Sequence, residues 1–356
     1  MNANPNASPK NRSAPPQVVL AVSQGVTPGL AQDAPVRDFE RLSQAMGAVL
    51  VGNESSGRIP LLGRIENATA LDFGQAMHIL RTHPRADAYV SFSERVGIPL
   101  AAILALRKRR PAHVLIAHRL DTRAKQLLDS LTRWRLGVDR IITVCSAQLA
   151  YARQFVPDAS QFVRAGSTDE SYYRPSGAAE EGYVLAVGKE NRDYETLLAA
   201  ISLTSLKVKV VCASPWSRKS APASLAQNDR VEFLPRLSYP ALRELYHKAR
   251  LVVLPLNDVE YAAGLNGLLE AFCAHKPVVV SASKGISDYL VHLRNAFVVP
   301  AADASAMATA LDAVYADSSL REALSSGARE AVADYANLNA FTSTLQSQIA
   351  KTIQEV

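Results

Sequence analysis

Short apolar, β-branched runs alternate along this chain with longer segments whose apolar positions recur at helical spacing. Runs that are apolar on both faces are typical of parallel strands covered on both sides by helices. Alternation over the whole chain predicts an α/β protein with two doubly wound, Rossmann-like sheets facing a central cleft. The predicted strands are 17–22, 47–52, 88–92, 113–117 and 140–145, and then 183–188, 207–212, 231–234, 251–256, 277–282 and 296–300.

The segments between the strands predict helices. Residues 98–110 end in a basic turn, which complements the negative end of a helix dipole. Residues 238–250 begin with Ser238 as a candidate N-cap. The segment 172–183 has no periodicity and separates the two halves. We therefore expect a disordered tail at 1–16, an N-terminal Rossmann-like domain at 17–176, a C-terminal Rossmann-like domain at 177–336 and a helix in 337–356 that packs back onto the first domain.

Composition places the chain among globular proteins, with 356 residues, 48% hydrophobic and 20% charged. The three cysteines lie in apolar runs, which predicts reduced core residues of a cytoplasmic protein. No apolar segment reaches the roughly 18 residues that a membrane span needs, and residues 1–16 lack the apolar centre of a signal peptide. We expect a cytoplasmic protein, at most attached to the inner face of the membrane.

The net charge of +6 is concentrated in the first half, where residues 107–140 carry ten Lys/Arg against three Asp. This segment is either a solvated helix face or a surface for an anionic membrane or a phosphate-bearing acceptor. Apart from Trp134, this segment has no aromatic residue among its basic ones, and no nucleic-acid-binding module is recognisable, so we expect no nucleic-acid partner.

Several common site chemistries have no motif here. The chain lacks G-x-G-x-x-G after the first strand, the P-loop, G-x-S-x-G, H-x-x-x-H and D-x-D. A bound diphosphate would then be neutralised by basic side chains and helix N-termini, with no metal and no cofactor. The segment 184–200 supplies such groups, since Gly188, Lys189 and Arg192 follow a strand and precede a helix. The alternative is an ordinary strand-to-helix turn with exposed charges.

The stretch "GLNGLLEAFCAHKP" (264–277) adds a second half to this candidate site. The backbone N–H groups of Gly264, Leu265 and Asn266 are placed to donate to a phosphate at a helix N-terminus. Glu270, one to two turns into that helix, is placed to accept hydrogen bonds from ribose hydroxyls. The alternative for Glu270 is a partly buried helix carboxylate paired with a neighbour.

These segments resemble the GT-B glycosyltransferases of family 4, the "glycosyl transferases group 1" type. The resemblance lies in "LLEAFCAHKPVVVSASKGISDYL", "VLAVGKENRDYETLLAA" and "YPALRELYHKARLVVLPL", and in the crossover-like "VDRIITVCSAQLAYARQFVP" with "AGSTDESYYRP". It implies that Lys189 and Arg192 hold the diphosphate of a nucleotide-sugar donor and that Glu270 holds the ribose. The N-terminal domain would take the acceptor, with His118 near the donor sugar; otherwise His118 is a turn histidine on a strand-end carbonyl.

The chain departs from the family pattern at one position. The family has a second glutamate eight residues before the equivalent of Glu270, and here that residue is Ala262. A shifted loop would bring Glu260 to the sugar; otherwise backbone amides hold it. The resemblance implies retention at the anomeric carbon, an outcome that Ala262 puts in question. Inversion would require a base on the first domain, with Asp33, Glu94 and His118 as candidates.

The sequence thus predicts a metal-independent glycosyltransferase that moves a sugar from a nucleotide diphosphate-sugar to a hydroxyl of a glycan or lipid-linked acceptor, with retention favoured. Assembly of surface polysaccharide or glycolipid is the expected setting. Two alternatives stay open. One is a non-catalytic homologue that binds sugar nucleotides, and the other is a sugar-nucleotide epimerase with the same architecture.

Overall fold

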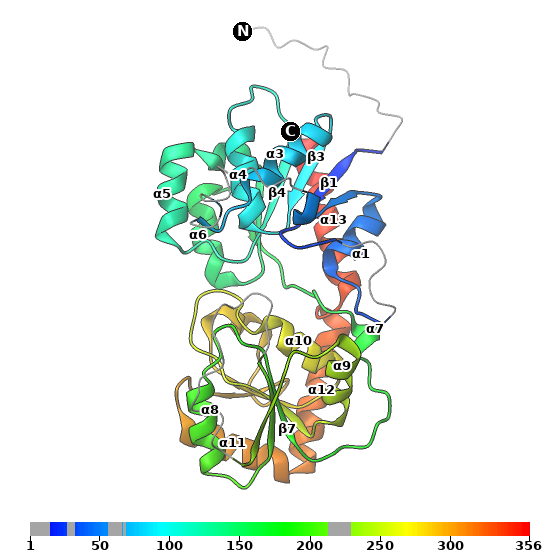
Figure 1. Cartoon of the computed structure of the whole chain (residues 1–356), viewed down its shortest axis with the longest axis vertical. Helices are drawn as coiled ribbons and strands as arrows, with labels where there is room; N and C mark the ends of the chain where they lie inside the picture. The colour runs from blue at the N-terminus through cyan, green and yellow to red at the C-terminus, as the bar shows by residue number, and fades with distance from the viewer. Residues whose placement is uncertain (1–14, 27–32, 56–65, 67–68, 213–228) are drawn as a thin grey trace.

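The computed structural model describes residues 15–26, 33–55, 66, 69–212 and 229–356. Within these residues the chain forms two six-stranded sheets in which every strand pair is parallel. The two sheet domains lie one above the other along the long axis (Figure 1). The predicted pair of doubly wound, Rossmann-like domains is confirmed. Of the tail expected at 1–16, residues 1–14 lie outside the described part.

The first sheet has the strand order β2-β1-β3-β4-β5-β6. Val19 of the central β1 pairs with Val49 on one side and Tyr89 on the other. The strands are β1 (Val18–Ala21), β2 (Val49–Val51), β3 (Ala88–Ser91), β4 (Ala112–Ala117), β5 (Arg140–Thr143) and β6 (Ser160–Phe162). The helices of this half are α1 (Asp38–Met46), η1 (Asn53–Ser55), α3 (Phe73–Thr82), α4 (Glu94–Leu104), α5 (Arg123–Thr132), η2 (Trp134–Gly137), η3 (Ser146–Gln148) and α6 (Leu149–Phe155).

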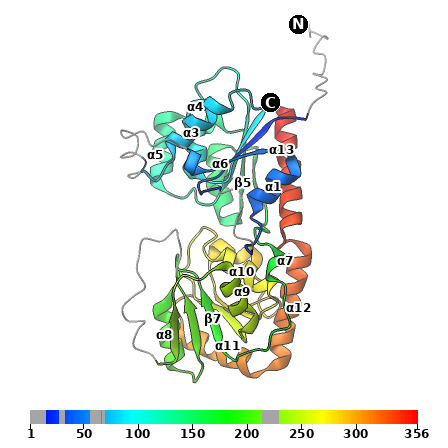
Figure 2. The same cartoon turned by 45° about the vertical axis from the view of Figure 1, so that its right-hand side comes forward.

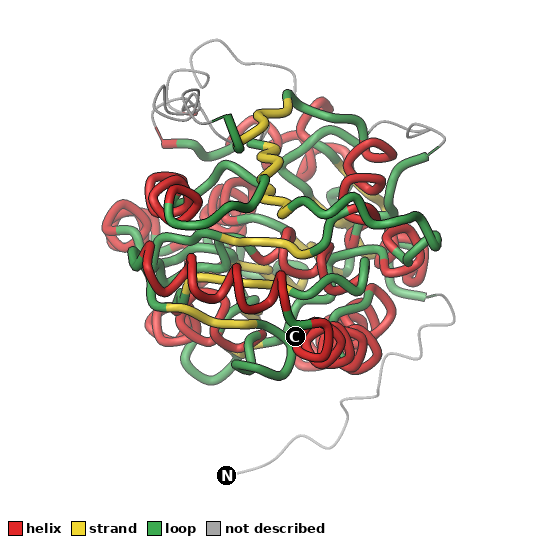
Figure 3. The backbone as a smooth tube through the Cα atoms, turned by 90° about the horizontal axis from the view of Figure 1, so that it is seen from below, coloured by secondary structure: helices red, strands yellow, loops and turns green. Residues whose placement is uncertain are grey.

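The second sheet has the order β12-β11-β10-β7-β8-β9. Its strands are β7 (Val184–Val187), β8 (Val208–Val211), β9 (Val231–Leu234), β10 (Leu251–Leu254), β11 (Val278–Ser281) and β12 (Phe297–Val299). Its helices are α8 (Tyr194–Ser202), α9 (Tyr239–Lys248), α10 (Leu265–Cys273), η5 (Lys284–Tyr289), α11 (Ala304–Ala316) and α12 (Ser318–Asp334). Figure 3 shows helices on both sides of the strands. This layering explains why the strands are apolar on both faces.

Each sheet has one point where the strand order reverses. The chain leaves β1 for β2 and returns to the other side of β1 with β3; it likewise leaves β7 for β8 and β9 and returns with β10. In open parallel sheets, ligands bind outside the carboxyl ends of the strands that flank such a switch point. The topology therefore directs attention to the loops after β1, β3, β7 and β10.

All the predicted strands are present, and one further strand, β6, was not predicted. Its three residues, Ser-Gln-Phe, carry no apolar run, and it lies at the sheet edge, beside β5 only. The helix expected at 98–110 is α4, which begins earlier because Ser93 caps it by accepting from the N–H of Arg95. It ends at Leu104, before the basic turn, so the expected dipole contact of that turn is wrong. Ser238 caps α9 as predicted.

The last helix, α13 (Leu338–Glu355), leaves the second domain and packs against α1 and β4 of the first. In Figure 2 it runs along one side of the first domain, and α12 runs along the same side of the second. Arg140, a buried residue of β5, fixes its end: Nε donates to Thr352 Oγ1 at 2.7 Å and Nη2 donates to Glu355 Oε2 at 2.7 Å. The two domains are thus joined by α13 as well as by the segment that contains α7 (Glu170–Tyr173).

The two connections between the domains touch at Gly166. A Cβ atom added there would lie 2.1 Å from the carbonyl oxygen of Asn337 and 2.5 Å from that of Tyr335. Both oxygens belong to backbone at the junction of α12 and α13, so neither can rotate away as a side chain would. Glycine is required here by the close approach of two backbones.

We predict that Gly166→Ala lowers the free energy of unfolding by about 1–3 kcal/mol, the usual cost of forcing atoms into a packed site. Urea denaturation measures this change. Ala179→Val, at an exposed position of the same connection, is the control and should leave the midpoint unchanged. A wild-type midpoint for Gly166→Ala would contradict the backbone contact.

Candidate active site

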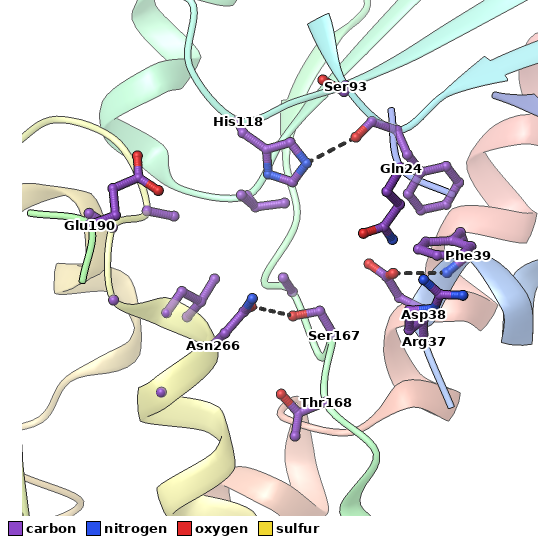
Figure 4. A pocket seen from close by; sticks show the side chains of 18 of the residues that line it. Gln24, Arg37, Asp38, Phe39, Ser93, His118, Ser167, Thr168, Glu190 and Asn266 are labelled. Carbon is purple, nitrogen blue, oxygen red and sulfur yellow. Dashed lines mark hydrogen bonds between the residues drawn. The ribbon is translucent and has the colours of Figure 1, made fainter. Parts of the chain in front are cut away.

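A cavity of about 690 Å³ lies between the two domains and is lined by the loops after β1, β3, β7 and β10. Its volume falls within the range of roughly 300–1,000 Å³ that is usual for ligand pockets. The first domain contributes residues that include Gln24, Asp38 and His118, and the connection between the domains adds Ser167 and Thr168 (Figure 4). The two switch points thus form opposite walls of one cavity.

The wall formed by the second domain contains every predicted donor-binding residue. These residues come from the loop after β7, from the loop after β10 and from the first turns of α10. They are Gly188, Lys189, Arg192, Gly264, Leu265, Asn266 and Glu270.

The Arg192 guanidinium lies against the backbone of three glycines. A Cβ added at Gly188 would lie 2.4 Å from Nη2 of Arg192, one at Gly264 3.4 Å from Nη1, and one at Gly267 3.6 Å from Nη2. Gly188 and Gly264 also have φ values of 105° and 92°, which side chains other than glycine rarely adopt. The loop after β7 therefore holds this cation at the N-terminus of α10.

Carbonyl groups fix Arg192, and no carboxylate of the described residues pairs with it. Nε donates to the carbonyl of Val187 at 3.0 Å, and Nη1 donates to that of Glu190 at 2.9 Å. Burial lowers the pKa of Arg192, as expected for a charge whose surroundings compensate it only in part. The positive end of a helix repels a guanidinium, and an anion between the two would offset this repulsion.

Two further groups complete this positive wall. Lys189 lines the cavity and has neither a hydrogen bond nor an ion pair within the described ranges. At the start of α10, the N–H of Leu265 donates to the Ala262 carbonyl at 3.4 Å, while the N–H groups of Gly264 and Asn266 have no protein partner in the described part of the chain. The Asn266 side chain accepts from Ser167 Oγ at 3.4 Å (Figure 4).

Glu270 is held by two tyrosines. Tyr246 Oη donates to Oε2 at 2.8 Å, and Tyr173 Oη donates to Oε1 at 3.2 Å. The two tyrosine rings meet edge to face, with centroids 5.8 Å apart. Burial raises the pKa of Glu270 to about 7, although both hydroxyls and the Arg192 charge favour the ionised form. The alternative of a helix carboxylate paired with a neighbour is correct in part: Glu270 accepts hydrogen bonds from two tyrosines, but it also lines the cavity.

Glu260 does not reach the cavity. Its Oε2 accepts from Tyr151 Oη at 2.7 Å, and its Oε1 from Lys284 Nζ at 3.3 Å. Its carbonyl accepts from Gln148 Nε2 at 2.8 Å. The hydrogen bond from Tyr151 is the main reason why the pKa of Glu260 is lowered. The structure does not have the shifted loop that would bring Glu260 to a sugar. Glu260 instead ties the loop after β10 to Tyr151 and Gln148 of the first domain.

Tyr261 and Ala262 occupy the part of the loop that lines the cavity. Tyr261 Oη donates to Glu190 Oε1 at 3.2 Å, and the Arg119 guanidinium lies 4.6 Å from the centre of its ring. Beneath the loop, a Cβ at Gly285 would lie 1.8 Å from the Tyr261 carbonyl oxygen. Glycine at 285 therefore sets how closely the loop packs on the start of η5.

His118 lines the first-domain wall and is exposed. Its Nε2 donates to the Phe92 carbonyl at 3.2 Å, the strand-end contact that the sequence offered as the alternative (Figure 4). Its own N–H donates to Glu94 Oε1 at 2.7 Å. The structure places His118 at the cavity, and its role toward the sugar stays a prediction.

The other two candidate bases are engaged elsewhere. Glu94 lines the cavity, but it is buried and holds the backbone N–H groups of His118 and Arg119. Asp33 does not line the cavity, and its two oxygens accept from Nη1 and Nη2 of Arg243, both at 3.1 Å. That pair joins the two domains.

Sequence reasoning missed several residues of the cavity. Tyr173 and Tyr246 come from α7 and α9, and nothing in their spacing links them to Glu270. Asp38 was also missed, although its place at the start of the helix that follows the first strand was a usable signal. Gln24 lies in the loop after β1 at the switch point, where the topology alone would have placed it.

Comparison with known proteins decides the family of the second half. Residues 190–331 match the family described as "Glycosyl transferases group 1". Over these residues the chain is similar to the group 1 glycosyltransferases. The predicted family is thereby confirmed for that region, while its assignment to family 4 stays a prediction. None of the curated protein sequences compared matches this glycosyltransferase.

Solved structures extend the likeness to the whole fold. Sucrose-phosphate synthase from Thermosynechococcus elongatus aligns with a TM-score of 0.74 at 15% identity, over 96% of this chain and 100% of that one. HepE from Anabaena, in complex with UDP-glucose, aligns at 0.70 and 15% identity, over 95% and 100%. WaaG, a glycosyltransferase involved in lipopolysaccharide biosynthesis, aligns at 0.58 and 17%, over 93% and 99%. The predicted GT-B fold is confirmed.

The raised pKa of Glu270 predicts a specific pH dependence of stability. A carboxyl whose pKa is higher in the folded than in the unfolded state stabilises the fold below its unfolded value of about 4.3 and loses that contribution as pH rises through about 7. From pH 5 to 8, wild type should lose about 2–3 kcal/mol more stability than Glu270→Gln. Urea denaturation at several pH values measures the free energy of unfolding of both proteins. If it changes with pH in the same way in wild type and in Glu270→Gln, the pKa of Glu270 is not raised.

Proposed function

We propose that this glycosyltransferase moves a sugar from a nucleotide diphosphate-sugar to a hydroxyl acceptor. The observation that carries the proposal is the Arg192 guanidinium at the N-terminus of α10, without a carboxylate partner among the described residues. A diphosphate is an anion of the right size to lie between them and Lys189. The complex of HepE with UDP-glucose, a protein of the same fold, supports this choice.

The same groups would serve the reaction. When the bond between sugar and diphosphate breaks, negative charge grows on the leaving phosphate, and preorganised cations and N–H groups stabilise it. Arg192, Lys189 and the first turn of α10 would supply this stabilisation without a metal or cofactor. Each oxygen of Glu270 receives one tyrosine hydroxyl and has a further lone pair for a ribose hydroxyl.

The stereochemical course depends on which group takes the acceptor's proton. In retention the departing phosphate can take it, and no protein base is needed; this is the outcome that we favour. The donor sugar would be held mainly by backbone amides of the loop at Ala262, with His118 on the acceptor side. Retention is tested by comparing the anomeric configuration of the product with that of the donor sugar.

Two other functions remain as alternatives. A non-catalytic homologue is motivated by Ala262, since that change removes a carboxylate expected near the donor sugar. A sugar-nucleotide epimerase would need carboxylates at the ring carbons, and Glu260 is held away from the cavity by Tyr151 and Lys284. That observation favours the transferase over the epimerase.

The donor class is tested by thermal stabilisation with UDP, GDP and ADP and with their sugar conjugates. A ligand present at about a hundredfold its Kd should stabilise the protein by about 2.7 kcal/mol. We expect stabilisation by one nucleotide series in wild type and its loss in Glu270→Ala. Lys351→Ala, at an exposed position of α13, is the control and should respond as wild type. No stabilisation of wild type by any of these ligands would refute the donor site.

Turnover separates the three candidate functions. A transferase releases free nucleoside diphosphate and passes the sugar to an acceptor, a non-catalytic homologue leaves the donor intact, and an epimerase changes the sugar while the nucleotide stays attached. Ion-exchange chromatography of the reaction mixture distinguishes these products.

For the setting, we propose action at the cytoplasmic face of a membrane, on a glycan or lipid-linked acceptor of surface polysaccharide or glycolipid assembly. Three exposed leucines lie in the basic segment 107–140 or at its edge: Leu106 (83% exposed), Leu131 (74%) and Leu127 (63%). Five basic residues of this segment have no ion pair within the described residues: Arg107, Lys108, Arg109, Arg123 and Arg133. Exposed leucines beside unpaired cations fit an anionic bilayer. No helix among the described residues is long and apolar enough to cross a membrane.

We predict that vesicles containing phosphatidylglycerol sediment the protein, whereas vesicles of phosphatidylcholine alone do not. Each cation near an anionic surface contributes about 1 kcal/mol, so binding should weaken as salt increases. Leu127→Ser with Leu131→Ser should reduce binding, and Leu203→Ser, an exposed leucine of the second domain, should not. Equal binding to both vesicle types would contradict the proposal.

A further inference from the structure

Asp38 is a carboxylate of the first domain that the proposed chemistry does not use. It is the first residue of α1 and lines the cavity. Its Oδ1 accepts from the N–H of Phe39 at 2.8 Å, a bond drawn in Figure 4. Burial raises the pKa of Asp38, and the Phe39 N–H and the charge of His118 offset this only in part.

No cation pairs with Asp38 in the part of the chain that the structure describes. The adjacent Arg37 is bound instead to Glu40, with Nε donating to Oε1 at 3.0 Å and Nη2 donating to the same oxygen at 2.5 Å. Apart from the Phe39 N–H, no hydrogen bond to the Asp38 carboxylate is present among the described residues. Asp38 is partly buried. A carboxylate that is withdrawn from water without a cation beside it costs stability, and such groups collect where a ligand supplies the missing contact.

Gln24 provides a second polar group on the same wall. It follows β1, is partly buried, and its side-chain amide makes no hydrogen bond within the described ranges. Figure 4 draws Gln24 and Asp38 on the first-domain side, with their polar ends directed toward the cavity. A carboxylate accepts only, whereas an amide both donates and accepts. Together they match the alternating donors and acceptors of neighbouring sugar hydroxyls.

We propose that Asp38 and Gln24 bind hydroxyl groups of the acceptor, and that this acceptor is a sugar residue. We assign Asp38 and Gln24 to the acceptor, and not to the donor, on the basis of the proposed function and of the negative charge of Asp38. The wall with Lys189 and Arg192 attracts the diphosphate, and a carboxylate on the opposite domain would repel it. A neutral polyhydroxyl ligand can approach Asp38 because each hydroxyl donates a hydrogen bond to it.

The test follows nucleoside diphosphate release from UDP-glucose, GDP-mannose and ADP-glucose, with and without a panel of p-nitrophenyl pyranosides. Glycosides should stimulate wild type above the rate of donor hydrolysis. Asp38→Asn, which keeps the size of the side chain, should raise the KM for the glycoside about 10- to 100-fold, as loss of a charge-assisted hydrogen bond implies. Gln24→Ala should raise it by a smaller factor. Asp158→Asn, at an exposed position of the first domain, should leave it unchanged.

The donor side separates this inference from the proposed function. Asp38→Asn should bind the nucleoside diphosphate with a wild-type Kd, by calorimetric titration. An unchanged glycoside KM would overturn the assignment, and a weaker nucleotide Kd would show that Asp38 serves the donor. Wild type that binds nucleotide but is stimulated by none of the glycosides would refute a sugar acceptor and leave the donor site standing. Failure of wild type to bind any nucleotide would refute the proposed function itself.

Discussion

The structure of the site depends on one cation that has no ion pair among the residues that the structure describes. Arg192 lies between Gly188, Gly264 and Gly267, at the positive end of α10, and only carbonyl groups of the described residues accept its hydrogen bonds. Any larger side chain at Gly188 would collide with the guanidinium. The guanidinium and the helix N-terminus repel each other, and an anionic ligand between them would interact favourably with both.

Topology explains why the remaining groups gather around that cation. Each sheet reverses its strand order once, and the loops at both reversals open into the same cavity. The two connections between the domains touch at Gly166, and one of them brings Tyr173 to Glu270. Contacts such as Asp33–Arg243 and Tyr151–Glu260 hold the domains together around the cavity. The two walls of the cavity and the two connections between the domains therefore depend on one another.

The sequence predicted what local patterns encode. Val-rich runs gave the strands, and the order of strand, glycine and cation placed Gly188 and Arg192 at the right edge of the sheet. The sequence could not reveal β6, because Ser-Gln-Phe contains no apolar run, nor the tyrosines of Glu270, which come from two other elements. For Glu260 the sequence predicted a contact that the structure does not have. Its nearness in sequence to Ala262 suggested the sugar, but its side chain contacts Tyr151 and Lys284, which sequence order does not bring near.

The proposed function rests on the binding of a diphosphate by Arg192 and the start of α10. The most direct measurement is calorimetric titration of wild type and Arg192→Met with a nucleoside diphosphate and with its parent nucleoside. Loss of a charged hydrogen bond of about 1.5–3 kcal/mol should weaken diphosphate binding by roughly 10- to 150-fold and leave nucleoside binding unchanged. Equal diphosphate affinity in the two proteins would show that the guanidinium is structural, and the account of this site would fail.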